Sequence, residues 1–236
     1  MNSNDKLGFY FGISDTKIYI CFFDDEKKKL KNVVQFEIPG NINNNLNFKV
    51  ILNLLQKNIR KLEKQLGIYL NSGNISVQSK TYQSILFSVK NIFDEKKLDK
   101  EVITKIVRSG IQQIYNNDQN LNILHVIIKK YIIDNKVYVF FPKNIKFKKI
   151  ILEIEFICLD KNFIDKIKNL FNNCKIKVKN IVSYDYATRY LNDVKDDTMC
   201  LSAKKILEGV NRSEVVLIED TSKNKGLFDK VFNFFD

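Results

Sequence analysis

The sequence predicts a mixed α/β (α+β) fold, built as one large domain or two small ones. Stretches rich in aromatic and β-branched residues, which are typical of strands, alternate with stretches whose apolar residues recur at helical spacing. The chain of 236 residues is 44% hydrophobic and 28% charged, enough for a substantial hydrophobic core. It has only two prolines and eight glycines, so long disordered linkers are not expected.

The expected elements follow one another in mixed order. Two or three strands are predicted over residues 6–40, with a turn at Ser14–Asp15. A helix is predicted from residue 48, because apolar residues recur at helical spacing up to Leu66, and Gly67 suits its end. Further strands are predicted over 74–90, 122–142, 147–159 and 175–183, and further helices over 94–115, over 160–174 and from 184.

The formal net charge of +12 raises the question of nucleic-acid binding. Almost all the positive charge is lysine, and only Arg60, Arg108, Arg189 and Arg212 are arginine, the residue that grips phosphates through two donors. The lysines are spread over the whole chain, so a solvated basic surface is expected and nucleic acid is not an expected partner. A weak attraction to an acidic membrane surface stays open.

Candidate catalytic and metal-binding residues are few. The four cysteines are far apart and His125 is the only histidine, which excludes a histidine-based metal cluster and favours free thiols in a reducing cytoplasm. Glu153 and Glu155 alternate with apolar residues, which predicts a solvated strand face for both. No catalytic residue and no metal site are predicted. No run is long enough to span a membrane, and no signal peptide is expected at the N-terminus.

Several stretches, taken in order, match motifs that recur together in one protein family. Residues 122–134, NILHVIIKKYIID, are similar to a strand pair in which Leu-His-Val and Tyr-x-Ile-Asp recur together. Residues 11–24 resemble the first phosphate loop of the family, and residues 74–79 resemble the beginning of its inserted subdomain. Residues 171–191 are similar to a helix end, a short strand and the segment after it, and residues 223–236 to the C-terminal membrane-targeting helix. Together these stretches resemble the actin-like family of the bacterial cell-division protein FtsA.

The resemblance implies one remaining actin-like (RNase H-like) lobe, an inserted SHS2-like α+β subdomain and a C-terminal amphipathic helix. The implied boundaries are 1–74 and 160–212 for the lobe, 75–159 for the subdomain, 213–225 for a flexible linker and 226–236 for the helix. The family's second lobe has no counterpart. That lobe holds about half of the family's ATP site and the part implied to bind the FtsZ ring protein, so contact with an FtsZ-type protein stays open.

The phosphate loop itself departs from the family pattern. It is occupied by Gly12, Ser14, Asp15, Thr16 and Lys17, with Gly12 where the family has a carboxylate and Ser14 where it has glycine. No two glycines are adjacent anywhere in the chain, so the family's other glycine-rich loops are missing too. Phosphate cradles need glycine because backbone N–H groups must approach the phosphate closely. We therefore expect no ATP hydrolysis, no bound ATP and no other cofactor.

The last ten residues are amphipathic when they are placed on a helical wheel. One arc holds Leu227, Phe228, Val231, Phe232, Phe234 and Phe235, and the other holds Asp229, Lys230, Asn233 and Asp236. The six apolar residues, with Lys230, are the expected membrane-binding set, and the polar stretch before them favours a membrane surface over a partner groove or the chain's own domain. The free energy gained by burying the six apolar side chains nearly cancels the cost of ordering the ten residues. One tail should therefore bind the membrane weakly, and several tails on a self-associated protein should bind it more strongly.

The resemblance, taken with the amphipathic C-terminal residues, implies a non-catalytic FtsA-like cell-division scaffold, cytoplasmic and peripheral on the inner face of the cell membrane. Its expected partners are the inner-membrane lipid surface, copies of itself through the inserted subdomain, and cytoplasmic segments of membrane division proteins. Two alternatives stay open: a PilM-like pilus-assembly adaptor and a basic nucleic-acid-binding module. Steep salt dependence of DNA or RNA binding would indicate the latter.

Overall fold

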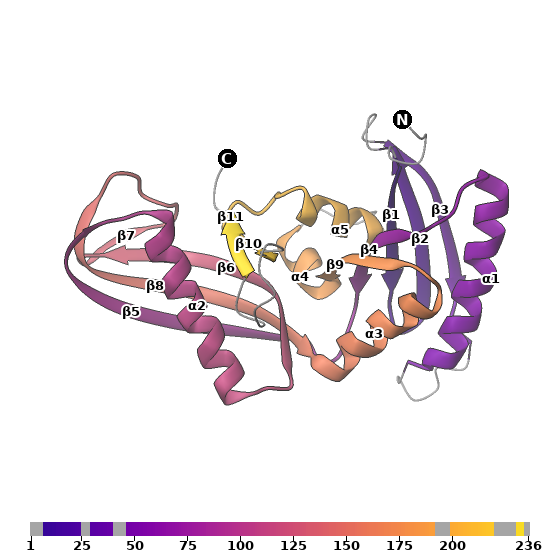
Figure 1. The fold of residues 1–236 in the computed structure, drawn as a ribbon, viewed down its shortest axis with the longest axis horizontal. Coiled ribbons are helices and arrows are strands. Elements are labelled where there is room, and N and C mark those ends of the chain that lie inside the picture. The colour runs from indigo at the N-terminus through magenta and orange to yellow at the C-terminus, as the bar shows by residue number, and fades with distance from the viewer. Residues whose placement is uncertain (1–6, 25–28, 40–45, 192–198, 220–229, 234–236) are drawn as a thin grey trace. The chain divides into compact units, whose positions relative to one another are not determined.

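The computed structural model describes residues 7–24, 29–39, 46–191, 199–219 and 230–233 (Figure 1). They form two compact units. Unit 1 comprises the described residues up to Tyr82 together with Asp160–Val210, and unit 2 comprises Gln83–Leu159 together with the described residues from Asn211 onward. Unit 2 therefore interrupts unit 1 in the sequence. Both units combine a sheet with helices, so the predicted mixed α/β class is confirmed.

Unit 1 contains a five-stranded sheet in the order β3-β2-β1-β4-β9. The first three strands pair in antiparallel fashion, and β4 and β9 continue the sheet parallel to β1. Three antiparallel strands followed by two parallel ones are the arrangement expected of an RNase H-like lobe. The strands are β1 (Leu7–Ile13), β2 (Lys17–Asp24), β3 (Lys29–Glu37), β4 (Ser72–Val77) and β9 (Lys177–Ser183).

The helices of unit 1 cover both faces of this sheet. They are α1 (Phe48–Leu66), α3 (Lys161–Asn173), α4 (Tyr184–Tyr190) and α5 (Met199–Leu207). The α3 face is marked by Phe11, whose ring lies 5.0 Å from that of Phe171. Neighbouring strand residues point to opposite faces, and Gly12 accordingly meets α5, where an added Cβ would lie 2.8 Å from the Cβ of Met199. Residue 12 must lack a side chain for α5 to pack this closely.

The first helix begins and ends where the sequence indicates. The Asn47 side chain accepts a hydrogen bond from the Val50 N–H, as an N-cap residue does, and satisfies one of the free donors of the first turn. Gly67 ends the helix with a φ of 66°, a left-handed conformation that glycine adopts at little cost.

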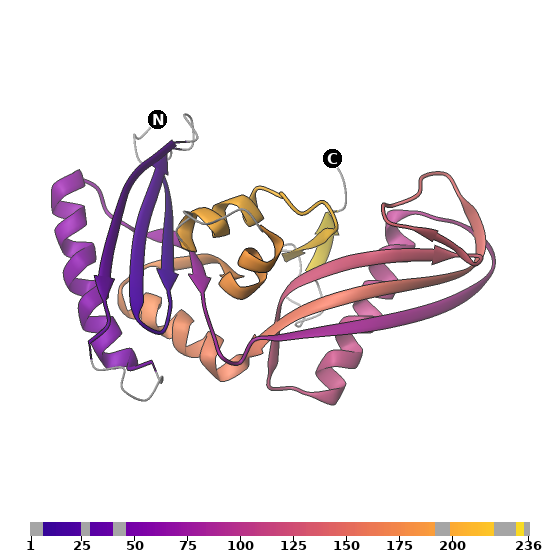
Figure 2. The ribbon, with the colours of Figure 1, turned by 180° about the vertical axis from the view of Figure 1, so that it is seen from behind.

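Unit 2 is a six-stranded sheet with one long helix against it (Figures 1 and 2). The strand order is β11-β10-β6-β8-β5, and the short β7 pairs with β6. The elements are β5 (Gln83–Lys97), α2 (Lys100–Asn117), β6 (Leu121–Ile133), β7 (Lys136–Tyr138), β8 (Lys146–Asp160), β10 (Glu214–Glu219) and β11 (Lys230–Asn233). One face of the sheet packs on α2, and their shared core includes Val102, Ile106, Val126, Leu152, Ile154 and Phe156.

The observed units do not divide the chain where the sequence places the domain boundaries. Residue 75, the expected beginning of the inserted subdomain, lies inside β4, which pairs with both β1 and β9 and so belongs to unit 1. The chain passes into unit 2 only after Tyr82.

Two of the predictions for the C-terminal segment are wrong in the described residues. The expected linker over 213–225 contains the strand β10, which pairs with β6, and the expected helix over 226–236 contains the strand β11, which pairs with β10. The run Val215–Ile218 is almost entirely β-branched, which favours a strand once the open edge of β6 offers backbone partners. Val231 is β-branched and Phe232 is aromatic, which also favours a strand, and β10 offers them backbone partners. Residues 220–229 and 234–236 lie outside the described part of the chain.

Candidate functional site

The predicted phosphate loop is the tight turn between β1 and β2, and its polar groups bond to one another. Ser14 Oγ accepts from the backbone N–H of Lys17 at 2.9 Å and of Thr16 at 3.3 Å. The Ser14 N–H donates to the Lys17 carbonyl at 2.9 Å. Phosphate cradles work through free backbone N–H groups that converge on the anion. Three N–H groups of this turn already have acceptors inside it, so the turn has the hydrogen bonding of a plain hairpin connection.

Gly12 and Lys17 also have structural roles. The space above Gly12 is filled by Met199 of α5. Lys17 Nζ lies 3.5 Å from Glu37 Oε1 on β3, the strand next to its own. The structure thus brings Gly12, Ser14 and Lys17 to one end of the sheet, where each contributes to packing, turn geometry or cross-strand pairing.

A second polar cluster lies where β4 and β9 end. These strands run parallel to β1, so their carboxyl ends lie at the same edge as the β1–β2 turn, the edge where many α/β proteins bind ligands. Ser183 caps α4 by accepting from the Tyr186 N–H at 3.3 Å, and Asp185 accepts from the Ser79 N–H at 3.3 Å. Burial raises the pKa of Asp185 above its ordinary value. Sequence reasoning missed the link between Asp185 and Ser79, because only folding brings these two segments together.

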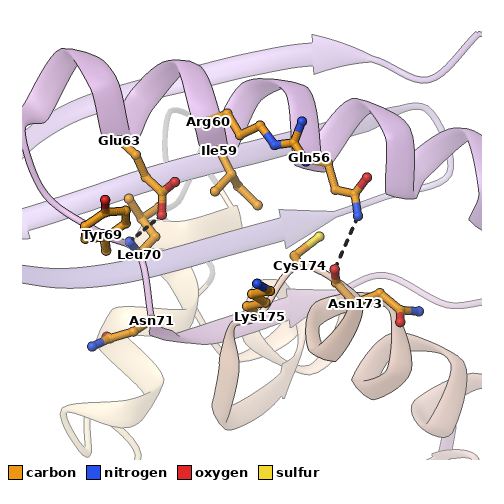
Figure 3. Close-up of a pocket in the computed structure, with 10 residues that line it drawn as sticks. All are labelled: Gln56, Ile59, Arg60, Glu63, Tyr69, Leu70, Asn71, Asn173, Cys174 and Lys175. Atoms are coloured by element: carbon orange, nitrogen blue, oxygen red, sulfur yellow. Dashed lines mark hydrogen bonds between the residues drawn. The ribbon is translucent and has the colours of Figure 1, made fainter.

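A cavity of about 300 Å³ lies at the opposite edge of the sheet, between α1 and the end of α3 (Figure 3). Its apolar floor is formed by Ile59 and Leu70, which are 4% and 3% exposed. Two hydrogen bonds shape its wall: Gln56 Nε2 donates to the Asn173 carbonyl at 3.2 Å, and the Leu70 N–H donates to Glu63 at 2.9 Å. The remaining lining residues are Arg60, Tyr69, Asn71, Cys174 and Lys175.

The chemistry of this cavity suits a small anionic or amide-bearing group. Arg60 and Lys175 supply two cations, against the single carboxylate of Glu63. Burial raises the pKa of Cys174 to about 11, so its thiol stays protonated at neutral pH and is a poor nucleophile. No motif in the sequence indicated this cavity, because folding alone brings residues 69–71 and 173–175 beside α1.

His125 is a buried histidine on β6. Its Nδ1 lies 2.6 Å from Glu214 Oε1, and its side chain is 4% exposed. Among the residues that the structure describes, no group of three or more His, Cys, Asp or Glu side chains could hold a metal ion. The four cysteines are free thiols.

The prediction that Glu153 and Glu155 share a solvated face is wrong for Glu155. This side chain is buried, accepts a hydrogen bond from Ser84 Oγ at 2.5 Å and lies 3.5 Å from Lys129 Nζ. The alternation of β8 does separate the two faces correctly. Because β8 lies between β6 and β5, side chains of both neighbours screen the second face from water.

The predicted membrane-binding set is only partly inside the described residues. Lys230, Val231 and Phe232 lie in β11, in register with Glu219, Ile218 and Leu217 of β10. In the same described part of the chain, no helix has both the length and the apolar character needed to span a bilayer. The other four members, Leu227, Phe228, Phe234 and Phe235, lie outside that part.

No protein-family model matches the sequence, and no curated protein matches it either. Among solved structures, the cytoplasmic domain of EpsL, an inner-membrane component of the type II secretion system of Vibrio cholerae, is similar with a TM-score of 0.38 and 9% identity. The alignment covers 77% of this chain and 57% of that one. A PilM–PilN type IV pilus biogenesis complex gives a TM-score of 0.47 and 8% identity over 80% of this chain and 50% of that one.

A third similar structure is a Bacteroides thetaiotaomicron protein described as having an actin-like ATPase fold and unknown function. It gives a TM-score of 0.36 and 12% identity over 83% of this chain and 60% of that one. The present chain therefore spans between half and three fifths of the length of these three structures. Likeness of this size carries no conclusion about activity, partners or family membership.

Proposed function

We propose that the protein is a non-catalytic, actin-like scaffold that holds partner proteins at the inner face of a membrane. The observation that carries this proposal is the β1–β2 turn, in which the N–H groups of Ser14, Thr16 and Lys17 all have acceptors within the turn. A turn whose N–H groups are already paired in this way offers few donors to a phosphate, which supports a role without nucleotide. It is suited to presenting surfaces to other molecules.

Among scaffolds of this kind, an FtsA-like role in cell division is the one that we prefer. Its support is the ordered resemblance of residues 11–24, 74–79, 122–134, 171–191 and 223–236 to that family. The partners that follow are further copies of the chain through unit 2, cytoplasmic segments of membrane division proteins, and inner-membrane lipid through the C-terminal residues. ATP is not a partner in this proposal.

A PilM-like adaptor is the second candidate, and one structural observation favours it. The FtsA-like role relies on a C-terminal membrane-targeting helix, whereas residues 230–233 of this region lie in a strand. If the whole C-terminal segment stays paired with unit 2, the protein would need a membrane-bound partner to reach the membrane.

Vesicle co-sedimentation tests the membrane part of this function. The full chain is compared with a version that ends at Lys225, using vesicles that contain an anionic phospholipid. Pelleting that requires residues 226–236 supports the FtsA-like scaffold. Equal pelleting of both versions shows that the body binds lipid by itself. If neither version pellets, direct membrane attachment is excluded and the adaptor candidate is favoured.

Isothermal titration with ATP and Mg²⁺ tests the non-catalytic part. We expect no binding heat, because the turn offers too few free donors for a phosphate. Micromolar binding together with phosphate release would contradict the proposal.

A further inference from the structure

The strand β7 and the connection from it to β8 expose an unusual group of apolar side chains. Val137, Val139 and Phe140 are 61%, 57% and 70% exposed. We call residues 136–149 the basic loop region, because they also carry several lysines. Both ribbon views show the β7–β8 connection as an open loop at one end of the sheet of unit 2 (Figures 1 and 2). Exposed apolar side chains that cluster on one loop indicate an interaction surface.

The exposure is built into the loop, because neighbouring residues anchor it from the inside. Tyr138 pairs in register with Tyr131 of β6, and the Phe141 ring stands at 76° to the Tyr131 ring, 6.0 Å away. Both Tyr138 and Phe141 pack against the core beneath α2. With residues 138 and 141 held inward, Val139 and Phe140 between them are held outward.

The charge around these apolar residues is strongly positive. The basic loop region, residues 136–149, contains five lysines and no acidic residue. With Asp134, which lies just before it, the net charge of residues 134–149 is +4. Asp134 is occupied, since it accepts from the backbone N–H groups of Lys148 and Lys149 at 3.2 and 2.8 Å. Four of the lysines are exposed and one is half-buried; the five are Lys136, Lys143, Lys146, Lys148 and Lys149.

The charged residues at the adjacent end of β5 change the net positive charge of this end of the sheet little. Glu95 lies 3.6 Å from Lys146 Nζ, with both side chains largely in solvent. Lys96 and Lys97 stand opposite Phe147 and Lys146 in the strand pairing, so they add cations at the same end of the sheet. Asp94 and Asp99 are the other acidic residues nearby in the sequence.

We propose that the basic loop region is a membrane-contact site for anionic phospholipid, with Val139 and Phe140 inserted at the headgroup boundary. An apolar pair held outward among lysines matches the chemistry of such a surface, where acyl chains take the apolar groups and acidic headgroups take the cations. Lysine also fits this partner, because attraction to an acidic surface needs charge and not the bidentate geometry of arginine. The site lies about ninety residues before the C-terminal segment, and neither needs the other.

Tryptophan fluorescence gives a direct test, because the chain contains no tryptophan. Phe140→Trp places a single reporter at the exposed tip, and Leu86→Trp, at a 64% exposed residue of unit 2 outside the basic loop region, is the matched control. With full-length protein and vesicles containing phosphatidylglycerol, we expect a blue shift and quenching by brominated lipid for Phe140→Trp only. We expect the response to disappear in phosphatidylcholine vesicles and to weaken with salt.

An unchanged spectrum of Phe140→Trp with anionic vesicles would overturn the proposal. A blue shift without lipid that grows with protein concentration would instead identify a second copy as the occupant.

Charge and apolar variants separate the two parts of the site. In the version that ends at Lys225, we expect Val139→Ser with Phe140→Ser to weaken vesicle binding about tenfold or more, and Lys143→Ser with Lys146→Ser to do so by a similar factor. Leu86→Ser, which replaces another exposed apolar residue of unit 2, should leave binding unchanged. A Leu86→Ser effect as large as that of the loop variants would contradict a localised site. If the C-terminal segment does not bind membrane, the Phe140→Trp response persists. If the basic loop region does not bind lipid but the C-terminal segment does, pelleting of the full chain still depends on residues 226–236.

Discussion

The Nδ1 atom of His125 on β6 lies 2.6 Å from the Glu214 carboxylate on β10, a strand that follows it by almost ninety residues. Both side chains are largely buried, at 4% and 14% exposure. Beside this pair, the Ile128 N–H donates to the Ser213 carbonyl at 2.9 Å. The only histidine of the chain thus helps to hold β10 on the sheet of unit 2.

We expect a double-mutant cycle of His125→Ala and Glu214→Ala to give a coupling energy of about 1–3 kcal/mol, because each single variant removes the partner of a buried polar group. Urea unfolding of the four proteins measures it. The exposed helix pair Glu101 and Lys105 is the control, and its removal should change stability little, because solvent screens it. A coupling energy near zero would show that the pair does not attach β10.

The cysteine at the α1–α3 cavity should react slowly. Burial raises the pKa of Cys174 to about 11 and that of Cys158 to about 12, so the nucleophilic thiolate is scarce at pH 7.5. Alkylation of Cys174, followed by mass spectrometry, should accelerate about tenfold per pH unit up to pH 10. Rapid, pH-independent labelling would contradict the protonated state.

The raised pKa of Cys174 also makes the free energy of unfolding depend on pH. The folded state holds the Cys174 proton more tightly than the unfolded state, whose thiol has the ordinary pKa of about 9. This contribution is therefore fully present below pH 9 and is lost as the pH rises toward 11. We expect Cys174→Ser to have a shallower fall of unfolding free energy between pH 9 and 11 than the natural chain. Identical slopes would show that Cys174 does not titrate differently on folding.

Local sequence signals predict the elements that are stabilised by neighbours in the chain. The helix α1 is recognisable from its apolar spacing, and its ends from Asn47 and Gly67. The β1–β2 turn is recognisable from Ser14 and Asp15, whose side chains suit tight turns. The strand order of unit 1 does not follow from these local signals, because periodicity does not say which strands are neighbours.

What the sequence could not predict depends on distant partners. Val215 becomes part of a strand because β6, about ninety residues earlier, offers it an open edge. Glu155 is buried because strands on both sides screen it, which alternation within β8 does not indicate. Val139 and Phe140 resemble the continuation of a strand, but β7 pairs with β6 over only three residues before the chain leaves the sheet.

Replacement of two apolar residues of unit 2 by alanine should lower the free energy of unfolding by different amounts. Ile154 is fully buried in the core beneath α2, so Ile154→Ala should lower the free energy of unfolding by about 2–5 kcal/mol. Leu124 on β6 is only half-buried and lies outside that core, so Leu124→Ala should cost distinctly less. Urea unfolding of both variants checks this order. Equal losses would indicate that the second face of the sheet is as tightly packed as the first.

Gly12 gives the sharpest test of how α5 lies on the sheet of unit 1. Adding a methyl group there brings it to 2.8 Å from the Cβ of Met199 and 3.1 Å from the Tyr19 ring, so α5 or β2 must shift. We expect Gly12→Ala to cost about 1–3 kcal/mol in thermal or urea unfolding, as overpacked cores do. Truncating Met199 to Ala should not rescue it, because the clashing Cβ remains.

The control for this variant is Gly67→Ala at the end of α1, where an added Cβ meets nothing within 4 Å but φ is 66°. Its loss of about 1 kcal/mol should come from backbone strain alone and should leave the packing of α5 unchanged. Hydrogen exchange distinguishes the two causes, since only Gly12→Ala should speed exchange of the amides of α5. If Gly12→Ala does not change stability and the α5 amides stay protected, there is space for a side chain at residue 12. Close packing of α5 on residue 12 would then no longer support a phosphate turn that is closed to nucleotide.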